Sequence, residues 1–293
     1  MMKLIASLFE RFGYRIDRLD VREIVCRYKT AENKLDRFLL QKRYKADERQ
    51  FGCRFYDFKV PSTPGLREAL ILQLDGNWIE YLYRTSIDEY ISLKPFFDEH
   101  IIGKMNGGLN IIDLGGGIGR SSVFLLNTNG LANEAQITVV DSNKDIATFS
   151  GSATAGYAML NDFQTGYHEG IVDIKKSAYT NFQVASDFLR SNNVKRFDIV
   201  ELGNFATLAL RFDLLYSFHS VGYHYSIKNA VVELKLAEKA NPGAFMIFGV
   251  RREHLKSDRT DKYAIPFNID GGFRLVDYVG GKCWQDYLIF QKI

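Results

Sequence analysis

The second half of the chain alternates short apolar runs with longer segments in which apolar residues recur every three or four positions. A short apolar run that ends at glycine or polar residues is typical of a buried strand, and the longer periodic segments are typical of helices. This alternation predicts βαβ units arranged around a mostly parallel sheet. The predicted strands span residues 109–114, 137–141, 197–202, 212–217 and 244–250, and the predicted helices span residues 119–128, 182–192 and 227–240.

Two more strands are predicted near the end of the chain, at residues 273–279 and 286–291. Only six residues, centred on Gly280 and Gly281, separate them. A parallel connection needs a crossover of a dozen or more residues, so these two strands must be antiparallel. A turn is also predicted at residues 241–243, Asn-Pro-Gly, just before the fifth strand.

The first hundred residues have a different pattern, which predicts helices. Apolar residues recur at helical spacing in residues 4–12 and again in residues 21–40, whereas residues 51–66 carry the prolines and glycines of a connection. We therefore divide the chain into a helical N-terminal extension, residues 1–104, and an α/β domain, residues 105–293.

An insertion is predicted inside this domain. About 55 residues separate the second strand from the third, where one helix and two short loops need roughly half as many. We assign residues 150–180 to the insertion. It is either surface decoration or a lid or wall beside a ligand site.

Composition narrows the class of protein further. Hydrophobic residues make up 46% of the 293 residues and charged residues 25%, as in ordinary globular proteins. No window approaches 18 consecutive apolar residues, so no membrane-spanning helix is predicted. The cysteines at positions 26, 53 and 283 are too scattered for a disulfide framework or a zinc cluster, which favours a reducing, cytoplasmic compartment. The sequence shows no convincing cluster of carboxylates, so no required metal is predicted.

The net charge of +3 does not indicate a nucleic-acid partner. Its distribution is uneven, because residues 1–50 hold 13 Lys/Arg and 8 Asp/Glu, a balance of 13 − 8 = +5. This basic start is either a solvated helical face or a surface that touches anionic lipid or an acidic partner. Peripheral membrane contact through the N-terminus therefore stays open.

A glycine-rich segment follows the first predicted strand. Asp113 is followed by glycines at 115, 116, 117 and 119, and an acid, Asp141, ends the second strand. A strand that turns through glycines into a helix exposes backbone N–H groups and lets a ligand approach the main chain. The dinucleotide pattern G-x-G-x-x-G fails, because its third glycine would be residue 120 or 122, which are Arg and Ser.

The pattern Asp113-x-Gly115-x-Gly117-x-Gly119 resembles motif I of the class I S-adenosylmethionine-dependent methyltransferases. The resemblance implies a Rossmann-like sheet of order 3-2-1-4-5-7-6, with adenosylmethionine as the cofactor. It assigns Asp113 and the three glycines to the methionine portion of the cofactor and Asp141 to the ribose. Ser142 would line the adenine, and Asn204 stands near the place where the family commonly has an acid for the adenine amino group.

The segment of residues 216–227, which begins at the end of the fourth strand, is similar to bacterial sugar O-methyltransferases. This resemblance implies a small polar acceptor such as a sugar or nucleotide sugar. Methyl transfer to an alcohol benefits from a base, and histidine suits that role near neutral pH. His219 and His224 are the candidate bases, with Tyr223 and Tyr225 as candidate substrate contacts. Either histidine could instead be packed among aromatic residues.

Several alternatives remain for the function. The acceptor could be another small molecule, a lipid or a protein. An NAD(P)-dependent oxidoreductase is a different class of protein, and the missing third glycine and the antiparallel tail disfavour it. A non-catalytic methyltransferase-like subunit is another alternative, and the intact glycines and Asp141 disfavour it because they indicate retained cofactor binding. The sequence does not determine the oligomeric state, and a homo-oligomer stays open.

Overall fold

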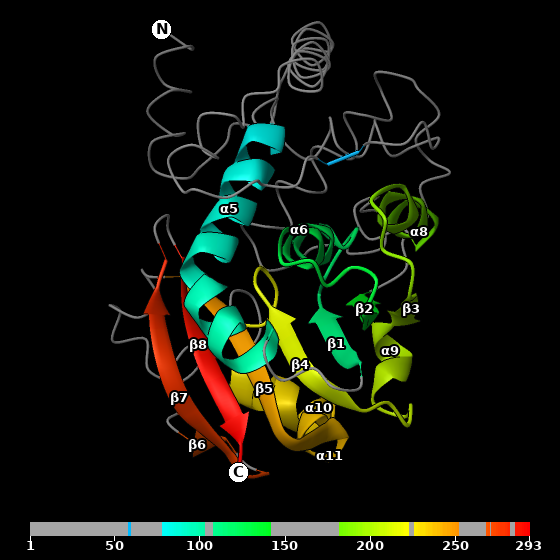
Figure 1. Ribbon diagram of the computed structural model, residues 1–293. Coiled ribbons are helices and arrows are strands. Elements are labelled where there is room, and N and C mark those ends of the chain that lie inside the picture. The colour runs from blue at the N-terminus through cyan, green and yellow to red at the C-terminus, as the bar shows by residue number, and fades with distance from the viewer. Residues whose placement is uncertain are drawn as a thin grey trace, which may run out of the picture.

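A single mixed sheet organises the chain in the computed structural model, which describes residues 58–59, 78–102, 108–141, 182–222, 226–251, 268–269, 271–281 and 285–293 (Figure 1). In chain order its strands are β1 (Leu109–Leu114), β2 (Ala135–Asp141), β3 (Phe197–Glu201), β4 (Phe212–Ser217), β5 (Ala240–Arg251), β6 (Asn268–Ile269), β7 (Phe273–Gly280) and β8 (Gln285–Lys292). Their order across the sheet is β3-β2-β1-β4-β5-β8-β7-β6.

This order confirms the predicted fold. β1 pairs in parallel with β2 on one side and β4 on the other, and β8 pairs antiparallel with both β5 and β7. With β7 and β8 taken as the predicted sixth and seventh strands, the order is 3-2-1-4-5-7-6 with an antiparallel last hairpin. β6 was not predicted; its two residues pair antiparallel with β7 and are too few to show a pattern.

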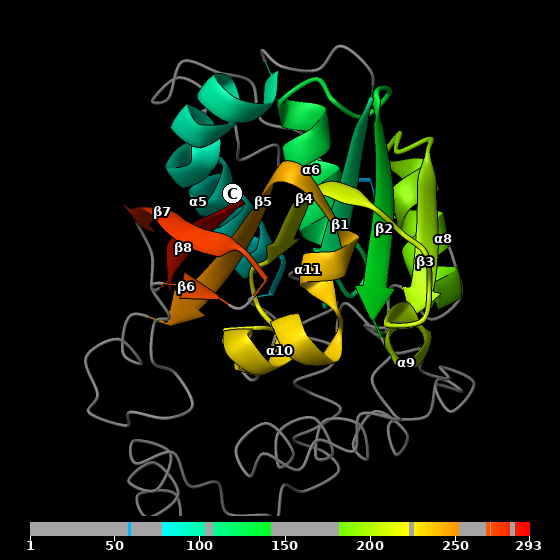
Figure 2. The same cartoon turned by 90° about the horizontal axis from the view of Figure 1, so that it is seen from below.

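Helices cover both faces of the sheet (Figure 2). One face carries α5 (Trp78–Phe96), α6 (Arg120–Thr128) and α8 (Phe182–Ser191), and the other carries α9 (Leu202–Phe205), α10 (Ile227–Glu233) and α11 (Leu236–Lys239). A π-helix, η1 (Phe97–Ile102), continues α5. Pro95 lies at this junction, where its missing N–H interrupts the α-helical hydrogen bonds.

Neighbouring residues of each central strand pack into two separate hydrophobic cores, one on each face of the sheet. Ile111 and Leu214 belong to the core under α5, α6 and α8, whereas Ile112 and Leu215 belong to the core under α10 and α11. Because successive side chains of a strand point to opposite faces, a strand buried on both faces needs apolar residues at neighbouring positions. This explains the adjacent apolar pairs at residues 111–112 of β1 and 214–215 of β4.

Two local predictions before the fifth strand were wrong in detail. The helix predicted at residues 227–240 is broken into α10 and α11 at Lys235, which has a φ of 52°. Residues 241–243 do not precede β5 but form an irregularity within it. Phe212 pairs with Ala240 and Leu214 with Phe245, so β5 contains three extra residues between these pairs.

Other predictions fall on residues outside those described. These are the helices of residues 4–12 and 21–40 and the insertion at residues 150–180. α5 belongs by residue number to the predicted extension, and its Tyr90 and Leu93 are buried in the core shared with α6. The division at residue 104 stays a prediction. Among the described helices, none combines the length and the apolar character needed to cross a membrane.

Candidate functional site

The turn between β1 and α6 has a backbone that favours glycine. Gly115, Gly117 and Gly119 have φ angles of 71°, 58° and 79°, which lie in the left-handed region that side chains other than glycine rarely adopt. Gly115 donates a hydrogen bond of 2.7 Å to the carbonyl of Val140, so the turn is fixed to β2. The backbone conformation of the turn therefore explains why glycine occupies alternate positions of the motif.

A side chain on any of three glycines of this turn would meet neighbouring atoms at less than 3.0 Å, so those neighbours would have to shift. A Cβ on Gly115 would lie 2.2 Å from Cβ of Ser220, and one on Gly119 would lie 2.8 Å from Cδ2 of Leu189. A Cβ on Gly116 would lie 2.6 Å from the carboxyl carbon of Asp113. The turn thus packs against the loop after β4, against α8 and against its own strand.

Asp141, at the end of β2, lies beside this turn. The backbone N–H of Gly117 donates a hydrogen bond of 2.8 Å to Oδ2 of Asp141. The structure thus brings together the glycines and the acid, although Gly117 and Asp141 are 24 positions apart in the sequence. A carboxylate can accept several hydrogen bonds, so the bond from Gly117 is compatible with the binding of ribose hydroxyls.

Asp113 lies beneath the turn and is only 3% exposed. Oγ of Ser122 donates to it over 2.5 Å, and the same Oγ is 2.7 Å from the hydroxyl of Tyr216. Burial raises the pKa of Asp113 to about 7, although the Ser122 hydrogen bond acts in the opposite direction. In this structure Asp113 supports the turn from inside the protein, and its role toward the methionine portion stays a prediction.

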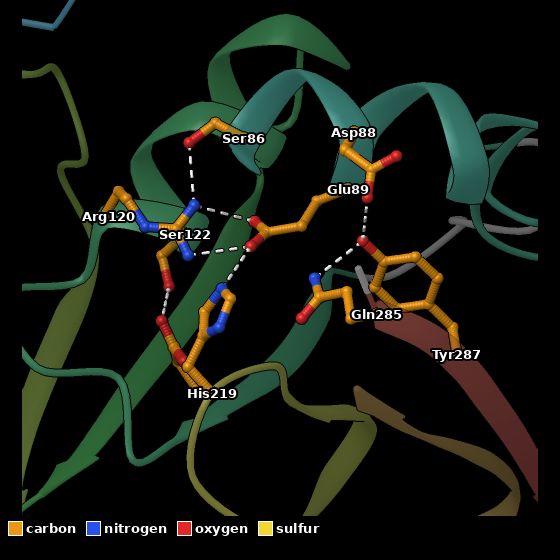
Figure 3. A network of polar contacts seen from close by, with 9 residues as sticks. Ser86, Asp88, Glu89, Arg120, Ser122, His219, Gln285 and Tyr287 are labelled. Carbon is orange, nitrogen blue, oxygen red and sulfur yellow. Dashed lines mark hydrogen bonds and ion pairs between the residues drawn. The ribbon is translucent and has the colours of Figure 1, made fainter. Parts of the chain in front are cut away.

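His219 lies in the loop that follows β4, on the same edge of the sheet (Figure 3). β4 lies next to β1 with Tyr216 paired to Asp113, and Oγ of Ser217 accepts a hydrogen bond from the backbone N–H of Val221 and so shapes the loop. The His219 side chain is partly exposed, and its Nε2 is 3.0 Å from Oε1 of Glu89 on α5.

Glu89 also forms a buried ion pair with Arg120, the first residue of α6. Two hydrogen bonds of 3.0 and 2.7 Å join the guanidinium to the two carboxylate oxygens, and Arg120 donates another of 2.8 Å to Ser86. Burial would raise the pKa of Glu89, but the charge of Arg120 and the contact with His219 outweigh it and hold that pKa below its usual value. Glu89 is therefore ionised at neutral pH.

The remaining predicted site residues are less informative. Asn204 lies on α9, directly after β3, with an exposed side chain, and its carbonyl accepts hydrogen bonds from Thr207. Its predicted contact with adenine stays a prediction. Four of the predicted residues lie outside the described part of the chain: Ser142, Tyr223, His224 and Tyr225.

Sequence reasoning missed the pair of Glu89 and Arg120, whose carboxylate the structure places against His219. One signal was present, because Glu89 shares helical spacing with Ser86, Tyr90 and Leu93, all of which are buried. An acid on the buried face of a helix needs a partner. The identity of that partner could not be read from the sequence, since Arg120 is 31 positions away.

No cluster of three or more His, Cys, Asp or Glu side chains that could hold a metal ion is found within the described ranges. The prediction that no metal is required also concerns the residues outside them, and it stays a prediction.

No protein-family model matches the sequence, and the search of curated proteins finds no match. Among solved structures, the chain is similar to a methyltransferase from Pyrococcus furiosus (15% identity, 89% of this chain and 98% of that chain, TM-score 0.43). It is also similar to a SAM-dependent methyltransferase from Aquifex aeolicus (11%, 73% and 98%, TM-score 0.42) and to an O-methyltransferase family protein from Burkholderia thailandensis (12%, 78% and 71%, TM-score 0.39). At these identities and TM-scores the likeness decides neither activity nor acceptor. The strand order of the sheet, not this likeness, defines the fold as that of the class I methyltransferases.

Proposed function

We propose that this protein is an S-adenosylmethionine-dependent methyltransferase that methylates a hydroxyl group of a small polar acceptor, such as a sugar or nucleotide sugar. One observation carries the proposal: the bare glycine turn after β1 lies beside the carboxylate of Asp141. Open α/β sheets bind ligands beyond the carboxyl ends of their strands, where the strand order reverses. Here that point lies between β1 and β4, where the glycine turn and the His219 loop meet.

The residues present fit the cofactor. The glycine turn offers backbone without side chains to the amino-acid portion, and Asp141 offers carboxylate oxygens to the ribose hydroxyls. When bound, adenosylmethionine would supply an electrophilic methyl group on its sulfonium sulfur, and the neutral thioether that remains after transfer is a good leaving group. The protein's task is then mainly to align the acceptor and to remove its proton.

His219 is the candidate base among the described residues. Its ring is partly exposed at the carboxyl edge of β4, and the next residue, Ser220, touches the glycine turn at Gly115. A base in this loop would stand next to bound cofactor. His224, the other candidate base, follows in the same segment of the sequence.

Calorimetry with adenosylmethionine and with NAD tests the cofactor. We expect binding of adenosylmethionine, weakened about tenfold or more in Asp141→Asn, because one charged acceptor of the ribose hydroxyls is lost (about 1–3 kcal/mol). The asparagine keeps an oxygen for Gly117. Asp198→Asn is the matched control, since Asp198 is an exposed acid near the start of β3, away from the carboxyl edge of the sheet.

Binding of NAD without adenosylmethionine would refute the proposal, and so would an Asp141→Asn variant that binds like the Asp198→Asn control. The acceptor is tested by intact mass, as a gain of one methyl on sugars or nucleotide sugars incubated with enzyme and cofactor. His219→Ala should then lose turnover while its affinity for adenosylmethionine is kept.

A further inference from the structure

We propose that Glu89 is a positioning residue for His219: its carboxylate fixes the ring proton on Nε2 and leaves Nδ1 as the nitrogen that binds the acceptor's proton. This inference rests on the proposed function, in which the proton leaves the acceptor hydroxyl as the methyl group takes its place on oxygen. It assigns a catalytic purpose to a contact between α5 and the loop after β4.

The carboxylate of Glu89 is held in one orientation by its neighbours. Glu89 is fully buried, and both of its oxygens are bound by Arg120, while Oε1 is also 3.0 Å from Nε2 of His219 (Figure 3). The bidentate pair with Arg120 leaves Glu89 little freedom to rotate. His219 thus meets a carboxylate whose position is set before any substrate arrives.

The same carboxylate is ionised and so determines which ring nitrogen carries hydrogen. An ionised carboxylate only accepts hydrogen bonds, and Arg120 together with His219 keeps the pKa of Glu89 low. Nε2 of His219 must therefore carry the hydrogen of the 3.0 Å contact. In a neutral ring with hydrogen on Nε2, the acceptor is Nδ1.

Glu89 also stabilises the ring of His219 once it has taken up a proton. The imidazolium then lies beside the Glu89 carboxylate, and an opposite charge within about 4–6 Å favours the charged form. Other titratable groups lie in the same region, and the effect of Glu89 on the protonation of His219 is expected to add to theirs. They are Arg120 on α6, Asp113 on β1, Tyr216 on β4, and Tyr287 on β8.

A second set of contacts supports α5 at the residue before Glu89. The buried Asp88 accepts a hydrogen bond of 3.2 Å from the hydroxyl of Tyr287, to which Gln285 donates another of 2.8 Å (Figure 3). These contacts tie α5 to β8 on the side away from Arg120. Asp88 faces Tyr287 while Glu89 faces His219, so Asp88 offers a matched control for Glu89.

The test is a histidine NMR titration of the full chain in the presence of adenosylmethionine, with the His219 signals assigned by His219→Gln. We expect hydrogen on Nε2 in the neutral ring of the wild type. The pH of half-protonation of His219 should fall by about one unit or more in Glu89→Gln, a roughly tenfold or greater weakening of proton binding. Glu89→Asp, which keeps the charge, should show a smaller fall, and Asp88→Asn should titrate like the wild type.

The outcomes separate the inference from the proposed function. If the wild type does not bind adenosylmethionine in calorimetry, the proposed function fails and this positioning role fails with it. If the wild type binds adenosylmethionine but Glu89→Gln titrates like the wild type, the proposed function stands and the inference is overturned. Should Glu89→Gln not fold, because Glu89 no longer balances the buried charge of Arg120, the double variant Glu89→Gln/Arg120→Met removes both charges. Arg120→Met is its reference, since both variants lack the Arg120 charge. Relative to Arg120→Met the double variant should show the same fall, and no fall between these two variants would be equally decisive against the inference.

Discussion

Replacing Gly115 by alanine tests whether the glycine turn and the His219 loop are in contact. The new Cβ would lie 2.2 Å from Cβ and 2.5 Å from Oγ of Ser220, where ordinary contacts lie at 3.4–4 Å. The turn cannot simply move away, because the N–H of Gly115 is bonded to the carbonyl of Val140 at 2.7 Å. Ser220 must therefore shift by more than an ångström, and His219, the preceding residue, must shift with it.

The cost has two parts. Alanine at a φ of 71° costs about 1–2 kcal/mol of backbone strain, and forcing a side chain into a filled space costs about 1–3 kcal/mol more. Gly130→Ala isolates the first part, since Gly130 has a φ of 74° and a Cβ added to it would meet no atom within 4 Å. We expect Gly115→Ala to lose about 2–5 kcal/mol of unfolding free energy and Gly130→Ala about 1–2 kcal/mol.

Urea unfolding measures both losses, and calorimetry measures adenosylmethionine binding by the two variants. Gly115→Ala should also bind the cofactor more weakly, whereas Gly130→Ala, at the far end of α6, should bind it like the wild type. Equal losses of unfolding free energy in the two variants would show that Ser220 does not lie against the turn, and the proposed meeting of the glycine turn and the His219 loop would be wrong.

Two further predictions concern the buried charges. Because the pKa of Asp113 is raised to about 7 in the folded protein from an ordinary value of 3.8, its stabilising contribution is full below about pH 4 and is lost as the pH rises to about 7. Asp113→Asn can still accept a hydrogen bond from Ser122 and does not titrate. Its unfolding free energy minus that of the wild type should therefore rise by a few kcal/mol from about pH 5 to about pH 8 in urea unfolding. The same difference at both pH values would contradict this. Arg120→Met should cost about 3–5 kcal/mol, because the buried carboxylate of Glu89 loses its bidentate partner and keeps only His219. Adding Glu89→Gln should recover part of that loss in the same assay; a double variant as unstable as Arg120→Met would argue against the pair.

The contrast between prediction and structure is clear at particular residues. The predicted strands at 109–114 and 212–217 have the bounds of β1 and β4, because a strand buried on both faces places apolar residues next to one another, as at 111–112 and 214–215. The bulge in β5 at residues 241–243 was not predicted. Asn-Pro-Gly indicates a turn, but it does not show whether a neighbouring strand pairs on both sides of that turn. Local pattern fixes the conformation of a segment but not its partner.

The sequence by itself determined the glycine turn and the acid that follows it, since each depends on residues close together in the chain. The family resemblance carried by those residues implied the strand order that the sheet has. Only the tertiary structure decided that Asp113 lies beneath the turn, that Gly115 lies against Ser220, and that Glu89 joins Arg120 to His219. Those contacts join residues up to 130 positions apart, and a hydrogen bond or ion pair is set by distances of a few ångström that spacing along a chain does not encode.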